Sequence, residues 1–131
     1  MLMDAKWTIK TTGGSENFTF SAATAQSSDA INLRGQGFAD GGGKLYLHAN
    51  RSGTYTKNAM TALAISLEHS DTEGSGYVMA EEKVLPVAAI DASTELVKIL
   101  LPPGLKQYIR VTITPTGAPT AITVNARITT S

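Results

Sequence analysis

Alternation of apolar and polar residues is the main pattern along this chain. From Ala62 to Ser70, bulky apolar side chains fall on odd positions and small or polar ones on even positions. This is the period of a strand with one buried face, and Tyr108–Thr114 and Ile122–Thr129 repeat it. We expect Pro115 to close the second of these strands. The predicted inward-facing residues are Leu63, Ile65, Leu67, Ile109, Val111, Ile113, Ile122, Val124, Ala126 and Ile128.

Shorter strand-like segments and turn-rich pieces fill the rest of the chain. The shorter strands are predicted at residues 7–11, 18–21, 30–33, 45–49, 77–85 and 96–101, and the turns at 13–15, 35–43, 52–53, 73–76 and 102–104. This spacing favours an all-β fold, namely a jelly-roll-like antiparallel β-sandwich of about eight strands. Residues 88–101 are the best candidate for a helix, but their β-branched and small residues suit a short turn and a strand at least as well.

Length and composition fit one ordered domain. The chain has 131 residues, of which 42% are hydrophobic and 17% charged, which is enough for a single core. We assign residues 13–131 to the sandwich and residues 1–12 to an N-terminal arm or a first strand. The chain has no cysteine, so stability must come from packing, as suits assembly in a reducing cytoplasm.

Charge and hydropathy exclude two classes of partner. Eleven basic and eleven acidic residues cancel without clustering, whereas binding to a phosphate backbone needs concentrated positive charge. The chain shows no secretory signal at its start and no apolar stretch near the roughly 18 to 20 residues that span a bilayer. We therefore expect neither nucleic acid nor membrane as a partner.

No residue pattern indicates catalysis or a cofactor. His48 and His69 are the only candidate general bases, and neither adjoins a nucleophile motif such as Gly-x-Ser-x-Gly. His69 shares the inward parity of its strand, which favours a packed or rim histidine. In the glycine-rich run 35–43, Asp40 stands where a phosphate-binding Gly-x-Gly-x-x-Gly loop needs its third glycine. We expect no enzyme, no cofactor and no metal centre.

Two acidic segments have a structural explanation. The turn 71–76 offers oxygen ligands at Asp71 and Glu73, but its spacing fits no EF-hand, and a solvated turn is the favoured interpretation. Whether this loop binds a cation is left open at this point. Glu81, Glu82 and Lys83 predict a sheet edge, where charges discourage sheets from joining.

Three segments together resemble a known family. The segments are 40–47 (DGGGKLYL), 62–71 (ALAISLEHSD) and 101–111 (LPPGLKQYIRV), and the opening MLMDA is similar too. They resemble the Bbp16-type capsid cement (decoration) proteins of tailed bacteriophages. The most specific piece is the Leu-Pro-Pro-Gly turn that leads into Tyr-x-Arg.

The resemblance implies a structural role in a virion. It implies a jelly-roll-like sandwich that forms a homo-oligomer, a dimer or a trimer, on the outer surface of a capsid assembled in the host cytoplasm. The partner would be the major capsid protein, whose contacts the cement protein stabilises, and no catalytic residues are implied. Within that interpretation we expect partner contacts in the N-terminal arm and the glycine-rich loop, at Leu2, Met3, Trp7, Gly37, Phe38 and Asp40.

Two other functions stay open on the sequence. One is another virion binding module, such as a tail, receptor-binding or carbohydrate-binding domain, which exposed aromatic side chains would favour. The other is a hydrolase, which would need a carboxylate and a hydroxyl to converge on one of the histidines in a pocket.

Overall fold

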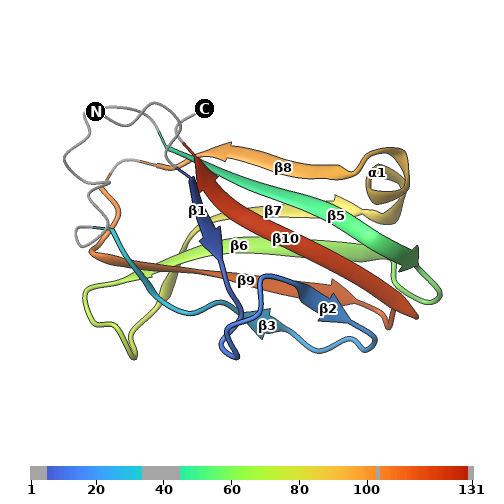
Figure 1. Cartoon of the computed structure of the whole chain (residues 1–131), viewed down its shortest axis with the longest axis horizontal. Helices are drawn as coiled ribbons and strands as arrows, with labels where there is room; N and C mark the ends of the chain where they lie inside the picture. Colours follow the sequence, from blue (N-terminus) through green and yellow to red (C-terminus); the bar gives the residue numbers. More distant parts are fainter. Residues whose placement is uncertain (1–5, 34–44, 103, 130–131) are drawn as a thin grey trace.

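The computed structural model describes residues 6–33, 45–102 and 104–129, and these form two antiparallel sheets packed face to face (Figure 1). The strands of the first sheet are β1 (Lys6–Ile9), β2 (Phe18–Phe20), β10 (Ala121–Thr129), β5 (Tyr46–Thr56) and β8 (Glu95–Leu100). The strands of the second sheet are β3 (Gln26–Ser27), β4 (Ile31–Asn32), β9 (Tyr108–Thr116), β6 (Ala62–Ser70) and β7 (Val78–Pro86). A single short helix in this part of the chain, α1 (Val87–Ala92), joins β7 to β8.

The strand order is that of a jelly roll. The first sheet reads β1-β10-β5-β8 with β2 also paired to β10, and the second reads β3-β9-β6-β7 with β4 also paired to β9. Since β1 and β2 share one edge of β10, and β3 and β4 share one edge of β9, the ten strands occupy eight positions. The predicted all-β, jelly-roll-like sandwich of about eight strands is confirmed.

The core lies between the inner faces of the two sheets. All ten residues predicted to face inward are buried, each with 1% or less of its surface exposed. Leu47, Ala49 and Ile9 add to this layer from β5 and β1, and Phe18 and Phe20 from β2. Full burial of an aliphatic or aromatic side chain contributes roughly 1.5–3 kcal/mol each, so this layer holds the sheets together.

Three strand boundaries differ from the prediction. Ser52 and Gly53, predicted as a turn, lie inside β5, where Gly53 has φ of 64° and the pairing with β10 shifts register, so the glycine forms a bulge. Pro115 does not close β9, which continues to Thr116. Pro115 is tolerated because it pairs with β6 on one side, while β3 pairs with β9 only at Thr112 and Ile113 on the other. Residues 88–101 form both a helix and a strand.

The end of the sandwich that carries α1 is held by local polar contacts. The Tyr55 hydroxyl donates a hydrogen bond to Asp91 Oδ1 (2.8 Å), and Lys57 Nζ lies 3.0 Å from Asp91 Oδ2. Burial and the bond to Asp91 raise the pKa of Tyr55 to about 12, whereas Lys57 and Tyr55 lower the pKa of Asp91. These contacts anchor the helix to β5.

Gly117 is the tightest point of this end and gives a stability prediction. Its φ is 81°, and a Cβ there would overlap the carbonyl oxygen of Ala59. Gly117→Ala should therefore lower the free energy of unfolding by about 2 kcal/mol, as measured by urea denaturation followed by circular dichroism. Gly74→Ala is the control, because its Cβ would meet nothing within 4 Å; equal losses in both variants would contradict the packing described here.

Candidate functional site: the loop end and the β7 edge

The end of the sandwich opposite α1 is where most of the long connections emerge. Across the first sheet, Lys6, Thr129, Tyr46 and Leu100 lie side by side through strand pairing. Across the second sheet, Asn32, Tyr108 and Ser70 do the same. We call this region the loop end and define it by Leu33, Leu45 and the segments 71–77 and 101–107. It lies at the left of Figure 1.

The segment 101–107, which contains the Leu-Pro-Pro-Gly turn, ties the loop end together. The Leu33 N–H donates to the Gln107 carbonyl (2.8 Å), and the Leu101 N–H donates to the Leu45 carbonyl (2.8 Å). Leu33 and Leu45 are the residues at which the chain leaves for, and returns from, residues 34–44. This one segment therefore holds both points of attachment of the glycine-rich loop.

The same segment also contacts the β6–β7 turn. The Lys106 N–H donates to Nδ1 of the half-buried His69 (3.2 Å), and Lys106 Nζ lies 3.8 Å from Asp71 Oδ2. His69 is thus a rim histidine whose ring nitrogen accepts a backbone hydrogen bond. The exposed ion pair contributes little stability by itself.

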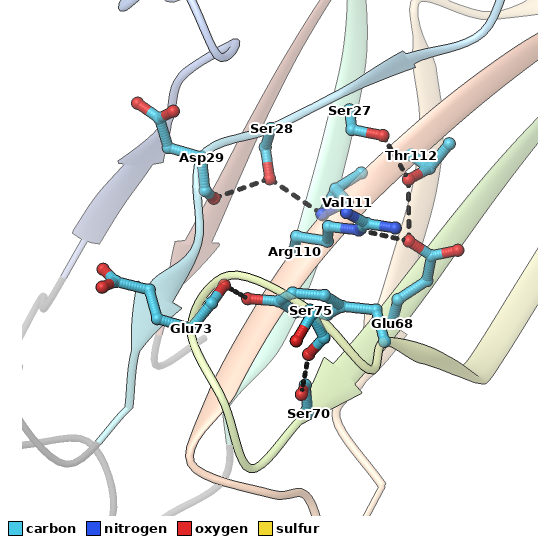
Figure 2. A network of polar contacts seen from close by, with 11 residues as sticks. Ser27, Ser28, Asp29, Glu68, Ser70, Glu73, Ser75, Arg110, Val111 and Thr112 are labelled. Carbon is cyan, nitrogen blue, oxygen red and sulfur yellow. Dashed lines mark hydrogen bonds and ion pairs between the residues drawn. The ribbon is translucent and has the colours of Figure 1, made fainter.

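The β6–β7 turn is closed by its own polar groups (Figure 2). The Ser70 hydroxyl donates to the Ser75 carbonyl and accepts the Thr72 N–H (3.0 Å). At the end of the turn the Tyr77 hydroxyl donates to the Glu73 carbonyl (2.7 Å), and burial raises the pKa of Tyr77. These bonds define the shape of the turn.

A charged network on the outer face of the second sheet supports this turn (Figure 2). Arg110 Nε lies 2.6 Å from Glu68 Oε1, which also accepts a hydrogen bond from the Thr112 hydroxyl (2.9 Å). The Arg110 guanidinium lies 4.3 Å above the centre of the Tyr77 ring, a cation–π contact. The Glu68 side chain is 19% exposed and Arg110 35%, so the pair is partly shielded from water.

The turn does not bring together a metal-binding group. Among the described residues, no cluster of three or more histidine, aspartate or glutamate side chains could hold a metal ion. Asp71 is instead directed at Lys106, and Glu73 contributes its backbone carbonyl to Tyr77. Nor is any helix in the described ranges long and apolar enough to cross a membrane.

Of the six predicted contact residues, only Trp7 lies in the part of the chain that the structure describes. Trp7 is the second residue of β1, the first described strand, and pairs with Ile128 of β10. The other five lie outside the described residues: Leu2, Met3, Gly37, Phe38 and Asp40. What the structure adds is that the segments carrying them attach at the same end of the sandwich.

Five aromatic rings of the described chain are either in contact with a cation or buried. Tyr46, Tyr55 and Tyr77 each lie beneath a cation, contributed by Lys98, Arg51 and Arg110 respectively. Phe18 and Phe20 are buried in the core. Stacking on sugars needs an open aromatic face, and in each of these three tyrosines a cation occupies one face of the ring.

The β7 edge is a second exposed feature, and sequence reasoning identified it only in part. β7 is the last strand of its sheet, which confirms the edge predicted from Glu81, Glu82 and Lys83. The sequence did not reveal that Val78, Met79 and Val84 are also exposed there. No alternation marks them, because Val78 and Met79 are adjacent and Val84 follows three consecutive charged residues.

A cleft lies beside β1 and β4. It has a volume of about 410 Å³ and is lined by Thr8, Lys10, Glu16, Asp29, Ala30 and Ile31. Neither histidine lines it, so the arrangement that a histidine-dependent hydrolase would need is not assembled there.

Comparison with known proteins extends the description of the fold. No protein-family model and no curated protein matches the sequence. Among solved structures, PirA is similar over 98% of this chain and 93% of its own, with 12% identity and a TM-score of 0.44. The SPBc2 prophage-derived protein YomS is similar over 98% and 96%, with 13% identity and a TM-score of 0.42. A non-crystalline cellulose specific carbohydrate-binding module, CBM28, is similar over 95% and 76%, with 13% identity and a TM-score of 0.46. Similarities this distant concern the β fold and carry no function to this chain.

The Glu68–Arg110 network on the second sheet should contribute more to stability than an ordinary surface contact. Arg110→Met keeps most of the side-chain volume but leaves the shielded Glu68 carboxylate without its cation. The free energy of unfolding should fall by about 1–2 kcal/mol, and protease should cleave the 71–77 turn faster. Lys98→Met is the matched control, since Lys98 also lies over a tyrosine ring but is exposed. This substitution should lower the free energy of unfolding by less than about 0.5 kcal/mol. Equal effects would show that the Glu68–Arg110 pair adds nothing.

Proposed function

We propose that this chain is a capsid cement protein of a tailed bacteriophage. It binds the outside of the assembled shell and stabilises contacts between neighbouring major capsid proteins. It has no catalytic activity, acts as a homo-oligomer, and uses neither nucleic acid nor membrane as a partner. The loop end is the surface that meets the capsid.

One observation supports this proposal above the others. Each of the three segments that carry the resemblance reaches the loop end: Leu45 precedes β5, residues 70–71 leave β6 for the turn, and residues 101–108 cross the end. The rest of the second and third segments extends along β6 and β9. The three segments are separate in sequence but adjacent in space. A shared binding surface explains why the resemblance falls on these segments.

The construction of this end suits a cement role physically. A rigid sandwich holds the ends of the loops, and binding residues are commonly carried on loops that such a scaffold positions. Many copies on a lattice, each an oligomer, convert a modest affinity per site into stable decoration through avidity. The overall charge of zero fits a contact that relies on shape rather than on strong fields.

A different virion binding module is the second candidate, and one observation weighs against its sugar-binding form. The described tyrosine rings at Tyr46, Tyr55 and Tyr77 are covered by cations, as set out above. A glycan that stacks on one of these three rings would have to displace the cation or use the opposite face. We therefore place capsid binding first.

The test mixes the purified protein with undecorated capsids of its source phage. Co-sedimentation should show saturable binding, and decorated capsids should disrupt at a higher temperature than bare ones. Gly74→Lys places a bulky charge on the loop end at a position where a side chain meets no atom, so it should weaken binding at least about tenfold without unfolding the domain.

Ala59→Lys is the matched control at the other end of the sandwich, where Ala59 is exposed; it should bind as the unmodified protein does. Phe38→Ala tests the glycine-rich loop directly and should also weaken binding. The proposal fails if the folded protein does not bind capsids, or if Ala59→Lys alone abolishes binding.

A further inference from the structure

β7 is an edge strand that is exposed on both faces. It pairs with β6 on one side, and no strand of the described chain pairs with its other side. Over its nine residues only Leu85 is buried, while Val78, Met79 and Val84 are 52%, 55% and 54% exposed. The pairing of β7 with β6 is regular over residues 81–86 and shifts register at Ala80. An edge with free backbone groups and exposed apolar side chains is a template for pairing with another strand.

The charges on this strand do not protect it in the usual way. Glu81 lies opposite Leu67 and Lys83 opposite Ile65, so both belong to the face that looks toward the other sheet. Both are nevertheless exposed, and neither takes part in an ion pair within the described chain. Inward charges that block an edge work by being buried without a partner, whereas these two have opposite signs and stand two residues apart.

Opposite signs at this spacing make the edge complementary to itself. If two β7 strands pair antiparallel around a two-fold axis, side chains of the same face must stand opposite each other. Centring the axis on Glu82 places Lys83 of each copy opposite Glu81 of the other, which gives two reciprocal ion pairs. Moving the centre to residue 81 or 83 removes both ion pairs and still leaves one pair of like charges opposite each other, Glu81 against Glu81 or Lys83 against Lys83.

We infer that β7 is a self-association edge, through which two copies of this chain pair antiparallel about Glu82 to form a dimer with one continuous sheet. The backbone groups of residues 81–83 of both edges are then satisfied, and the regular pairing ends at Ala80, where β7 bulges against β6. Because the contact is isologous, it produces a dimer and not a trimer. It thereby specifies the homo-oligomer of the proposed function and leaves the loop end free.

The register has one unfavourable pair. Glu82 faces its own copy on the outer face, and like charges directly opposite each other destabilise a sheet. Each Glu82 accepts a hydrogen bond from the Ser66 hydroxyl of its own chain (3.0 Å), which holds the carboxylate on the outer surface. Removing this charge should therefore tighten the dimer, an effect opposite to that of the flanking charges.

Analytical ultracentrifugation of the full chain over a range of concentrations tests the inference. The unmodified protein should sediment with twice the mass of the 13.8 kDa chain. Glu81→Lys and Lys83→Glu should each weaken dimerisation at least about tenfold, because both ion pairs become repulsive. An equimolar mixture of these two variants should restore the dimer, and so should the double variant E81K/K83E. Glu82→Gln should strengthen it.

The matched control is Lys98→Glu on β8, the edge strand of the other sheet, and it should leave dimerisation unchanged. Circular dichroism melting establishes that each variant is folded. A monomer at all concentrations overturns the inference, as does a dimer that neither single charge reversal weakens or that the mixture fails to restore. No capsid enters this experiment, so its failure and the failure of the capsid role are distinguishable.

Discussion

Burial of one apolar face from each sheet is the interaction on which the rest of this structure depends. The inner faces of β5, β6, β9 and β10 supply most of the fully buried side chains. Because side chains alternate, a slip of one residue in any of these strands would turn its apolar face to solvent. The core therefore fixes the register of both sheets, and the register fixes which connections emerge at which end.

The two ends of the sandwich are consequently built in different ways. The α1 end is compact, since Gly117 packs against Ala59 and Asp91 holds the helix to β5. At the loop end, backbone hydrogen bonds join residues 101–107 to Leu33 and Leu45, where a longer connection leaves the sandwich. Under the proposed function the compact end is scaffold and the loop end meets the capsid. The β7 edge would then join copies without competing for that surface.

Much of the fold could be predicted because the period of two persists in its central strands. The segments that became β6, β9 and β10 alternate almost without interruption, so their inner faces were named correctly. Prediction failed where the pattern ends before the strand does. β5 continues past Asn50 through Arg51–Thr56 with no alternating apolar residues, and Gly53 resembles a turn although it forms a bulge. β3 has two polar residues, Gln26 and Ser27, and offers no pattern at all.

The site was less predictable, for a physical reason. Charged residues indicated the β7 edge. The loop end, in contrast, is held by hydrogen bonds between residues far apart in sequence, such as Leu33 and Gln107. The Glu68–Arg110 pair likewise spans 42 positions and follows from the pairing of β6 with β9, not from any local motif. Such contacts become visible only once the sheet register is known.

Hydrogen–deuterium exchange of the protein, free and bound to capsids, tests the central claim most directly. Binding through the loop end should slow exchange in the β6–β7 turn, residues 71–77, and in residues 101–107, and leave residues 57–61 and 117–120 unchanged. Protection confined to the α1 end, or no protection at saturating capsid, would contradict the account.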